Sequence, residues 1–239
     1  MGIKTFKYDV TVLDIDYNNL LTNKGLLRIL QEAANMASSE VGYGVDSIEK
    51  NQTTWALLSW RLNIYKRPSF SDTITVQTWP RGFNKFYSVR EFKIFLNDEL
   101  IGVASSKWVL IDIQNHKIQK ITPELIEIYK PIEESVFDDE TNEKYKLQDN
   151  LTTDFEYTIM RRDLDPNHHV NNTCHLDIAL ESLKDDIYNL NFSNMEIVYK
   201  KELLHKDKVS CSYIYENDKH YIYLTTCDKT VLNSVIILY

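Results

Sequence analysis

Alternating apolar and polar residues predict two β-rich regions, each organised around one helix. From 20 to 44, apolar residues recur at helical spacing on most sides, and either Thr22 or Asn23 is expected to cap this helix. A second helix is predicted over 171–190. Strand-like alternation predicts strands at 5–14, 53–66, 72–82, 85–96, 99–112, 155–161, 194–203, 208–216, 219–228 and 230–239. The pattern indicates an α+β fold in which an antiparallel sheet wraps each helix.

The two regions are related by an internal repeat. At an offset of 149 residues, the segment 14–23 lies over 163–172, and four polar residues recur: Asp14 as Asp163, Asp16 as Asp165, Asn18 as Asn167 and Asn23 as Asn172. Each copy follows a strand and precedes a helix, so we interpret the repeat as a duplication. The predicted domains are 1–134 and 151–239, joined by an acidic linker at 135–150 that a short helix precedes.

Composition narrows the class of protein. The net charge is −8, which argues against nucleic acid as a partner, because phosphate binding depends on clustered cations. No apolar run is long enough for a membrane span. The three cysteines are widely spaced, form neither a disulfide framework nor a zinc motif, and favour a reduced cytoplasmic setting.

One segment resembles a family signature. Residues 165–172 read Asp-Pro-Asn-His-His-Val-Asn-Asn, similar to the D-x-N-x-H-V-N-N motif of acyl-acyl carrier protein thioesterases. A second family element, Tyr-basic-basic-Glu, is similar to Tyr199–Glu202. The resemblance implies a tandem hot-dog fold, with an acyl-binding first half and a catalytic second half. It also implies release of free fatty acids from acyl carrier protein. Leu203 stands where plant members carry a cysteine, which leaves no nucleophilic thiol there.

The motif supplies groups suited to attack of water on a thioester. His169 has the intrinsic pKa of a general base, and Glu202 is expected to act as the base or to polarise the water with it. Asn167 is expected to position the water or the carbonyl, and Asp165 to orient a side chain. The amides at the start of the second helix are expected to stabilise the oxyanion. The repeat aligns His169 with Leu20, and, at an offset of 135, Glu202 with Arg67. The first half therefore lacks both titratable candidates.

Other interpretations of these residues stay open. Asp-x-Asn before a helix is a common turn, which gives Asp165 and Asn167 a structural alternative. His168, expected to face solvent, is with His169 a weak candidate for a metal site, because neighbouring residues rarely point at one ion. Neither a metal nor a cofactor is expected, since the substrate itself carries 4′-phosphopantetheine. A hot-dog hydratase or dehydratase and a non-catalytic acyl-binding module are the alternative functions.

The expected partner, acyl carrier protein, is itself acidic and requires a basic face. The stretch 61–120 has a basic excess and supplies candidate docking residues, and Arg161 and Arg162 precede the motif. These candidates in the first half are Lys66, Arg67, Arg81, Lys85, Arg90 and Lys93. No transit peptide precedes Phe6, so a bacterial-type cytoplasmic enzyme is expected. The sequence leaves the acyl chain length open, and both monomer and homodimer are compatible with a tandem fold.

Overall fold

The structure is a computed structural model that describes residues 2–138, 145–165, 167–188 and 190–239. The chain divides into two compact units, Met1–Glu140 and Thr141–Tyr239, which are described separately. The predicted linker at 135–150 includes residues 139–144, which lie outside the described residues. No described helix is long and apolar enough to cross a membrane.

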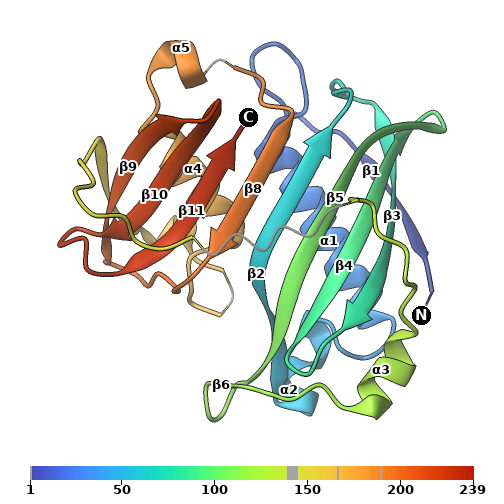
Figure 1. The fold of residues 1–239 in the computed structure, drawn as a ribbon. Coiled ribbons are helices and arrows are strands. Elements are labelled where there is room, and N and C mark those ends of the chain that lie inside the picture. Colours follow the sequence, from blue (N-terminus) through green and yellow to red (C-terminus); the bar gives the residue numbers. More distant parts are fainter. Residues whose placement is uncertain (1, 139–144, 166, 189) are drawn as a thin grey trace. The chain divides into compact units, whose positions relative to one another are not determined.

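The first unit is an antiparallel sheet whose inner face carries one long helix (Figure 1). Its strand order is β1 (Lys4–Asp9), β3 (Thr73–Phe83), β4 (Tyr87–Leu96), β5 (Glu99–Asp112) and β2 (Thr53–Ile64), and the short β6 (Lys117–Ile118) pairs with β5. Asn97 and Asp98 both have positive φ, as a two-residue hairpin turn with the right-handed twist of its strands requires. The strands and the hairpin predicted for this half are confirmed, except that the strand predicted over 5–14 is too long, because β1 ends at Asp9 and the chain turns between Thr11 and Asp14.

The helix α1 (Asn23–Ser39) forms the core of the first unit. Thr22 caps it, because its side chain accepts a hydrogen bond from the Gly25 amide. The apolar residues predicted to be buried are buried: Leu26, Leu27, Ile29, Leu30, Ala33, Ala34 and Ala37. The short helices η1 (Val45–Ser47) and α2 (Ile48–Asn51) lead from α1 into β2. Packing on several sides, rather than on one stripe, fixes α1 against the sheet.

The second unit repeats this arrangement on a smaller scale (Figure 1). Its strand order is β8 (Asn194–Tyr199), β11 (Leu232–Leu238), β10 (Lys219–Thr226), β9 (Lys208–Glu216) and β7 (Phe155–Thr158). The predicted helix over 171–190 is wrong in extent, because α4 (Asn172–Leu180) ends early and α5 (Asp185–Tyr188) follows separately. The Ser182 hydroxyl bonds back to the Ala179 carbonyl at 2.7 Å, and such a bond competes with continuation of the helix.

The described ends of the predicted linker lie against the sheets. After the predicted short helix, α3 (Pro123–Tyr129), the segment 132–137 runs along the outer face of the first sheet. The Trp79 indole donates to the Glu134 carbonyl at 3.0 Å, and the Arg61 guanidinium lies 4.0 Å from the Phe137 ring centroid. In the second unit, Tyr145 and Leu147 pack against a buried apolar cluster. The described linker residues therefore cover apolar and charged groups of both sheets.

Candidate active site

The motif loop of the second unit is built around the carboxylate of Asp165. Its Oδ1 accepts hydrogen bonds from the amides of Asn167 and His169, at 2.8 and 3.1 Å. The side-chain amide of Asn167 lies 3.4 Å from Oδ2. Asp165 therefore holds His169 through the backbone. Among the described residues it makes no hydrogen bond to the imidazole.

The same loop exists in the first unit, bond for bond. Asp16 Oδ1 accepts from the amides of Asn18 and Leu20, again at 2.8 and 3.1 Å, and the Asn18 side chain again lies 3.4 Å away. Asn19 and His168 occupy matching positions with φ of 65° and 64°. The repeat seen in the sequence is thus a repeated structure. Asp165 and Asn167 keep their geometry whether or not a histidine follows.

His169 and Glu202 are brought together by a short antiparallel contact. The Val170 amide donates to the Leu203 carbonyl at 2.9 Å, and His169 forms an isolated bridge with Leu204. This contact places His169 Nε2 3.4 Å from Glu202 Oε2. Both side chains are half-exposed, at 43% and 60%, so water and a substrate reach the pair directly. Of the four predicted site residues, these two form the only described pair of titratable side chains in contact here.

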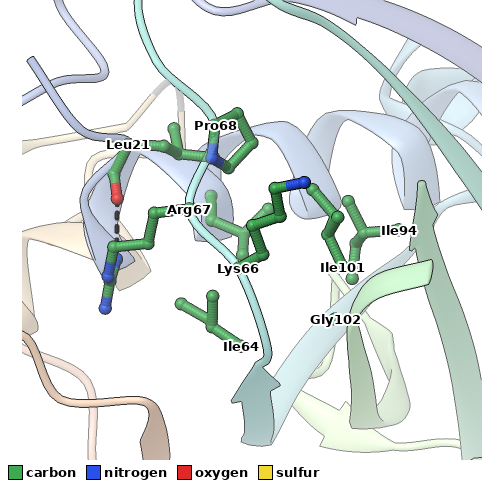
Figure 2. A pocket seen from close by; sticks show the side chains of 9 residues that line it. Leu21, Ile64, Lys66, Arg67, Pro68, Ile94, Ile101 and Gly102 are labelled. Carbon is green, nitrogen blue, oxygen red and sulfur yellow. Dashed lines mark hydrogen bonds between the residues drawn. The ribbon is translucent and has the colours of Figure 1, made fainter. Parts of the chain in front are cut away.

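The first unit uses the matching positions differently. Leu20 replaces the histidine, and Arg67 replaces the glutamate and donates at 2.6 Å both to the Leu21 carbonyl and to Asn23 Oδ1. Figure 2 shows the guanidinium turned toward the Leu21 carbonyl, at the edge of a small pocket. The pocket is lined mainly by aliphatic groups, including Ile64 and Ile101. Here the loop is held by a cation and carries no acid–base pair.

The start of α4 presents a backbone donor beside the motif. Asn171 caps the helix by accepting from the Thr173 amide at 3.0 Å, and its own amide donates to the Asp163 carbonyl. The Asn172 amide makes no hydrogen bond to any described residue, as expected of a first-turn amide. The Tyr199 hydroxyl, from the Tyr-basic-basic-Glu element, donates to the Asn172 carbonyl at 3.0 Å and fixes this first turn.

A buried histidine behind the loop has a role that the sequence did not reveal. The His175 ring lies 2.9 Å from Ser234 Oγ and stacks edge-on against Tyr199, with ring centroids 5.2 Å apart. Burial lowers the pKa of His175 to about 4, so it is neutral near pH 7. The contact with Tyr199 links the core around α4 to the site. Cys174, the neighbour of His175 in the chain, is only partly buried.

The described residues contain no cluster of three His, Cys, Asp or Glu side chains with metal-binding geometry. His168 is exposed, as predicted, and its amide donates to the Asp165 carbonyl. Its left-handed backbone gives it a direction different from that of His169. The two adjacent histidines therefore do not converge on one point in the described structure.

Comparison with known proteins identifies the family. The acyl-ACP thioesterase N-terminal domain matches residues 3–129, and the acyl-ACP thioesterase C-terminal domain matches residues 145–234. The chain therefore belongs to the acyl-ACP thioesterase family. It is 26% identical over 221 residues to the chloroplastic oleoyl-acyl carrier protein thioesterase of Coriandrum sativum, covering 85% of this chain and 60% of that protein. This chain thus spans about 60% of the length of such curated relatives.

Solved structures confirm the tandem hot-dog fold. An acyl-ACP thioesterase from Bacteroides thetaiotaomicron superposes with a TM-score of 0.87 at 20% identity, covering 99% of this chain and 96% of that one. The 12:0-ACP thioesterase from Umbellularia californica gives 0.85 at 18% identity, with the same two coverages. The α+β class and the helix-wrapping sheets predicted from the sequence are confirmed.

Proposed function

We propose that this protein hydrolyses fatty acyl thioesters carried by acyl carrier protein. The observation that carries the proposal is the contact of 3.4 Å between His169 Nε2 and Glu202 Oε2 on a loop whose duplicate lacks both groups. Family membership supports the choice of substrate. The loop of the first unit has the same shape although it lacks both side chains. Folding of the loop therefore does not require the His169–Glu202 pair, and we assign the pair to catalysis.

The reaction requires a water molecule beside the His169–Glu202 pair. As the water oxygen attacks the thioester carbonyl, the pair accepts its proton. Charge on the carbonyl oxygen is stabilised by the Asn172 amide at the start of α4, where the helix dipole is positive, and by the Asn167 side-chain amide. The carbon–sulfur bond then breaks, and the pair returns the proton to the departing thiolate. The products are a free fatty acid and the carrier thiol, and no cofactor takes part.

Thiol release from acyl carrier protein thioesters tests this mechanism. Replacing His169→Ala or Glu202→Gln removes proton transfer, and each change is expected to lower kcat by about 10²–10⁴-fold. The matched control is His168→Asn, which installs the residue that the first unit holds at the same φ. This control is expected to keep activity within about twofold, because His168 makes no side-chain contact in the described site.

The same assay distinguishes the alternative functions. A change in the acyl double bond without thiol release would identify a hydratase or dehydratase, and binding without any reaction would identify an acyl-binding module. Full activity in His169→Ala would refute the proposed site. The acyl-binding role of 1–134 and the cytoplasmic location stay predictions. They are tested by labelling with a photoreactive acyl chain and by cell fractionation.

A further inference from the structure

Exposed cations lie on three chain segments of the second unit that adjoin the segments of His169 and Glu202. They are Arg161 and Arg162 on η2 (Arg161–Asp163), Lys200 and Lys201 at the end of β8, and Lys206 in the turn before β9. We call these five residues the basic rim. Lys200 and Lys201 directly precede Glu202 in the chain, so the rim adjoins the proposed catalytic pair.

Hydrogen bonds tie the other two segments of the rim to each other and to the site. The Lys206 amide donates to the Ile159 carbonyl at 3.1 Å, and the Ile159 amide donates to the Asp207 carbonyl at 2.9 Å. Arg161 follows two residues after Ile159. Leu204, in the same turn as Lys206, forms the bridge with His169. The cations are therefore held at the site by backbone contacts rather than by long flexible loops.

Four of the five cations of the basic rim are free for a partner. Arg161, Lys200, Lys201 and Lys206 have no side-chain hydrogen bond or ion pair with any described residue. Arg162 is 78% exposed, but its Nε lies 3.9 Å from Asp163 and its Nη2 donates to the Tyr157 hydroxyl at 3.4 Å. Asp163 also accepts from the Met160 amide at 2.7 Å, and Asp207 accepts from the Leu204 amide at 2.9 Å.

The cations predicted as a docking face in the first unit are engaged within that unit. Lys66 pairs with Glu99, Arg81 with Glu91 and Lys93 with Glu134. Arg67 bonds the motif loop, Arg90 is buried with a bond to Thr78, and Lys85 lies 5.1 Å from the Phe86 ring centroid. A docking partner would have to displace these contacts. Docking at these six residues, the face expected from the sequence, stays an untested prediction.

The repeat supplies an internal comparison for the rim. The residues equivalent to Arg161 and Arg162 are Val12 and Leu13, which are 69% and 88% exposed. The backbone turn is the same in both units, since Asp14 and Asp163 each donate an amide hydrogen bond to the residue three positions earlier. Neither the turn nor the exposure requires arginine. The difference lies at these two positions, since Lys201 aligns with Lys66 at the offset of 135 and the first loop is itself held by Arg67.

We propose that the basic rim docks the acidic surface of acyl carrier protein and so delivers the thioester to His169 and Glu202. The inference rests on the proposed function and names the surface that its partner uses. Complementary charge steers an acidic partner to the rim and lowers its dissociation constant. Exposed Met160 and Leu204, at 45% and 44%, add apolar contacts between the cations.

Direct binding tests the rim independently of turnover. The probe is a fluorescently labelled acyl carrier protein that carries an amide-linked, non-hydrolysable acyl group, measured by anisotropy. Arg161→Glu combined with Arg162→Glu is expected to raise Kd by about tenfold or more at low salt. The difference is expected to shrink at high salt, where exposed charges are screened. The control Lys184→Glu reverses an exposed cation beyond the far end of α4 and is expected to change Kd by less than about twofold.

Hydrolysis of an acyl N-acetylcysteamine thioester, which has neither carrier nor phosphate, completes the test. The double variant is expected to hydrolyse it at the wild-type rate. Three results would contradict the docking proposal. The double variant could bind acyl carrier protein with an unchanged Kd, Lys184→Glu could weaken this binding equally, or the double variant could lose hydrolysis of the N-acetylcysteamine thioester. If wild type binds the carrier as predicted but releases no thiol from either thioester, the hydrolase proposal fails and the rim stands. If thiol is released but the substitutions leave Kd unchanged, only the docking proposal is refuted and the hydrolase proposal is kept.

Discussion

Glu91 predicts an unusual dependence of stability on pH. This residue of β4 points to the outer face of the first sheet, where the segment 132–137 covers it, and it is 1% exposed. Arg81 Nε lies 3.3 Å from its Oε1, and the Ser105 hydroxyl donates to the same oxygen at 3.3 Å. Burial nevertheless dominates these partners and raises the pKa of Glu91 from 4.5 to about 7.

The size and sign of the effect follow from linkage. The folded chain binds this proton more tightly than the unfolded chain, so stability is fully present below pH 4.5 and is lost as pH rises through 7. A shift from 4.5 to about 7 corresponds to about 3 kcal/mol. Glu91→Gln mimics the protonated acid. We expect the variant to match wild type near pH 4.5 and to exceed its unfolding free energy by up to about 3 kcal/mol above pH 8.

Urea unfolding of wild type and Glu91→Gln between pH 4.5 and 8.5 measures this difference. The two proteins must be compared at each pH, because buried His175 makes the unfolding free energy depend on pH in the opposite sense to Glu91. Its pKa is lowered from 6.5 to about 4, so its contribution is present above pH 6.5 and lost toward pH 4. The His175 contribution cancels between the two proteins. Glu134→Gln, which removes an exposed partner of Lys93, serves as the control and should give a flat difference above pH 6. Parallel curves for Glu91→Gln and wild type would refute the reasoning.

Matched substitutions in the two loops separate folding from chemistry. Asp16→Ala and Asp165→Ala each strand two backbone amides and should lower the unfolding free energy by about 1–3 kcal/mol in urea titrations. Only Asp165→Ala should also reduce thiol release by folded protein, and equal losses of activity would contradict this. Arg67→Met should cost about 1–3 kcal/mol, because the Leu21 carbonyl loses its donor. Lys66→Met, which breaks an exposed pair with Glu99, should cost less than about 1 kcal/mol, and a reversed order would contradict the role of Arg67.

Local patterns predicted most of the fold, because strands and α1 are specified by alternation, spacing and turn residues. Helix α4 was predicted too long, since a single hydroxyl bond from Ser182 ends it and no breaker residue announces the end. The motif put Asp165, Asn167 and His169 on one loop. Its contact with Glu202, 33 residues later, depends on pairing through Leu203 that the chain pattern alone does not show. Nothing in the sequence around Glu91 reveals that the segment 132–137 covers it.

The duplicated loops show how folding and chemistry are separated in this protein. Asp-x-Asn shapes both loops through the same backbone bonds, so these two residues do not mark the half that we propose to be catalytic. The distinction lies at two positions outside that scaffold. Where the first unit places Leu20 and Arg67, the second places His169 and Glu202, and a cation that ties down a carbonyl gives way to an acid–base pair. Because Asp165 already stabilises the loop, the loop does not need the side chains of His169 and Glu202 to fold, and this leaves them free for the chemistry that we propose. Arg161 and Arg162 differ between the units in the same way, on a turn that the first unit forms with Val12 and Leu13.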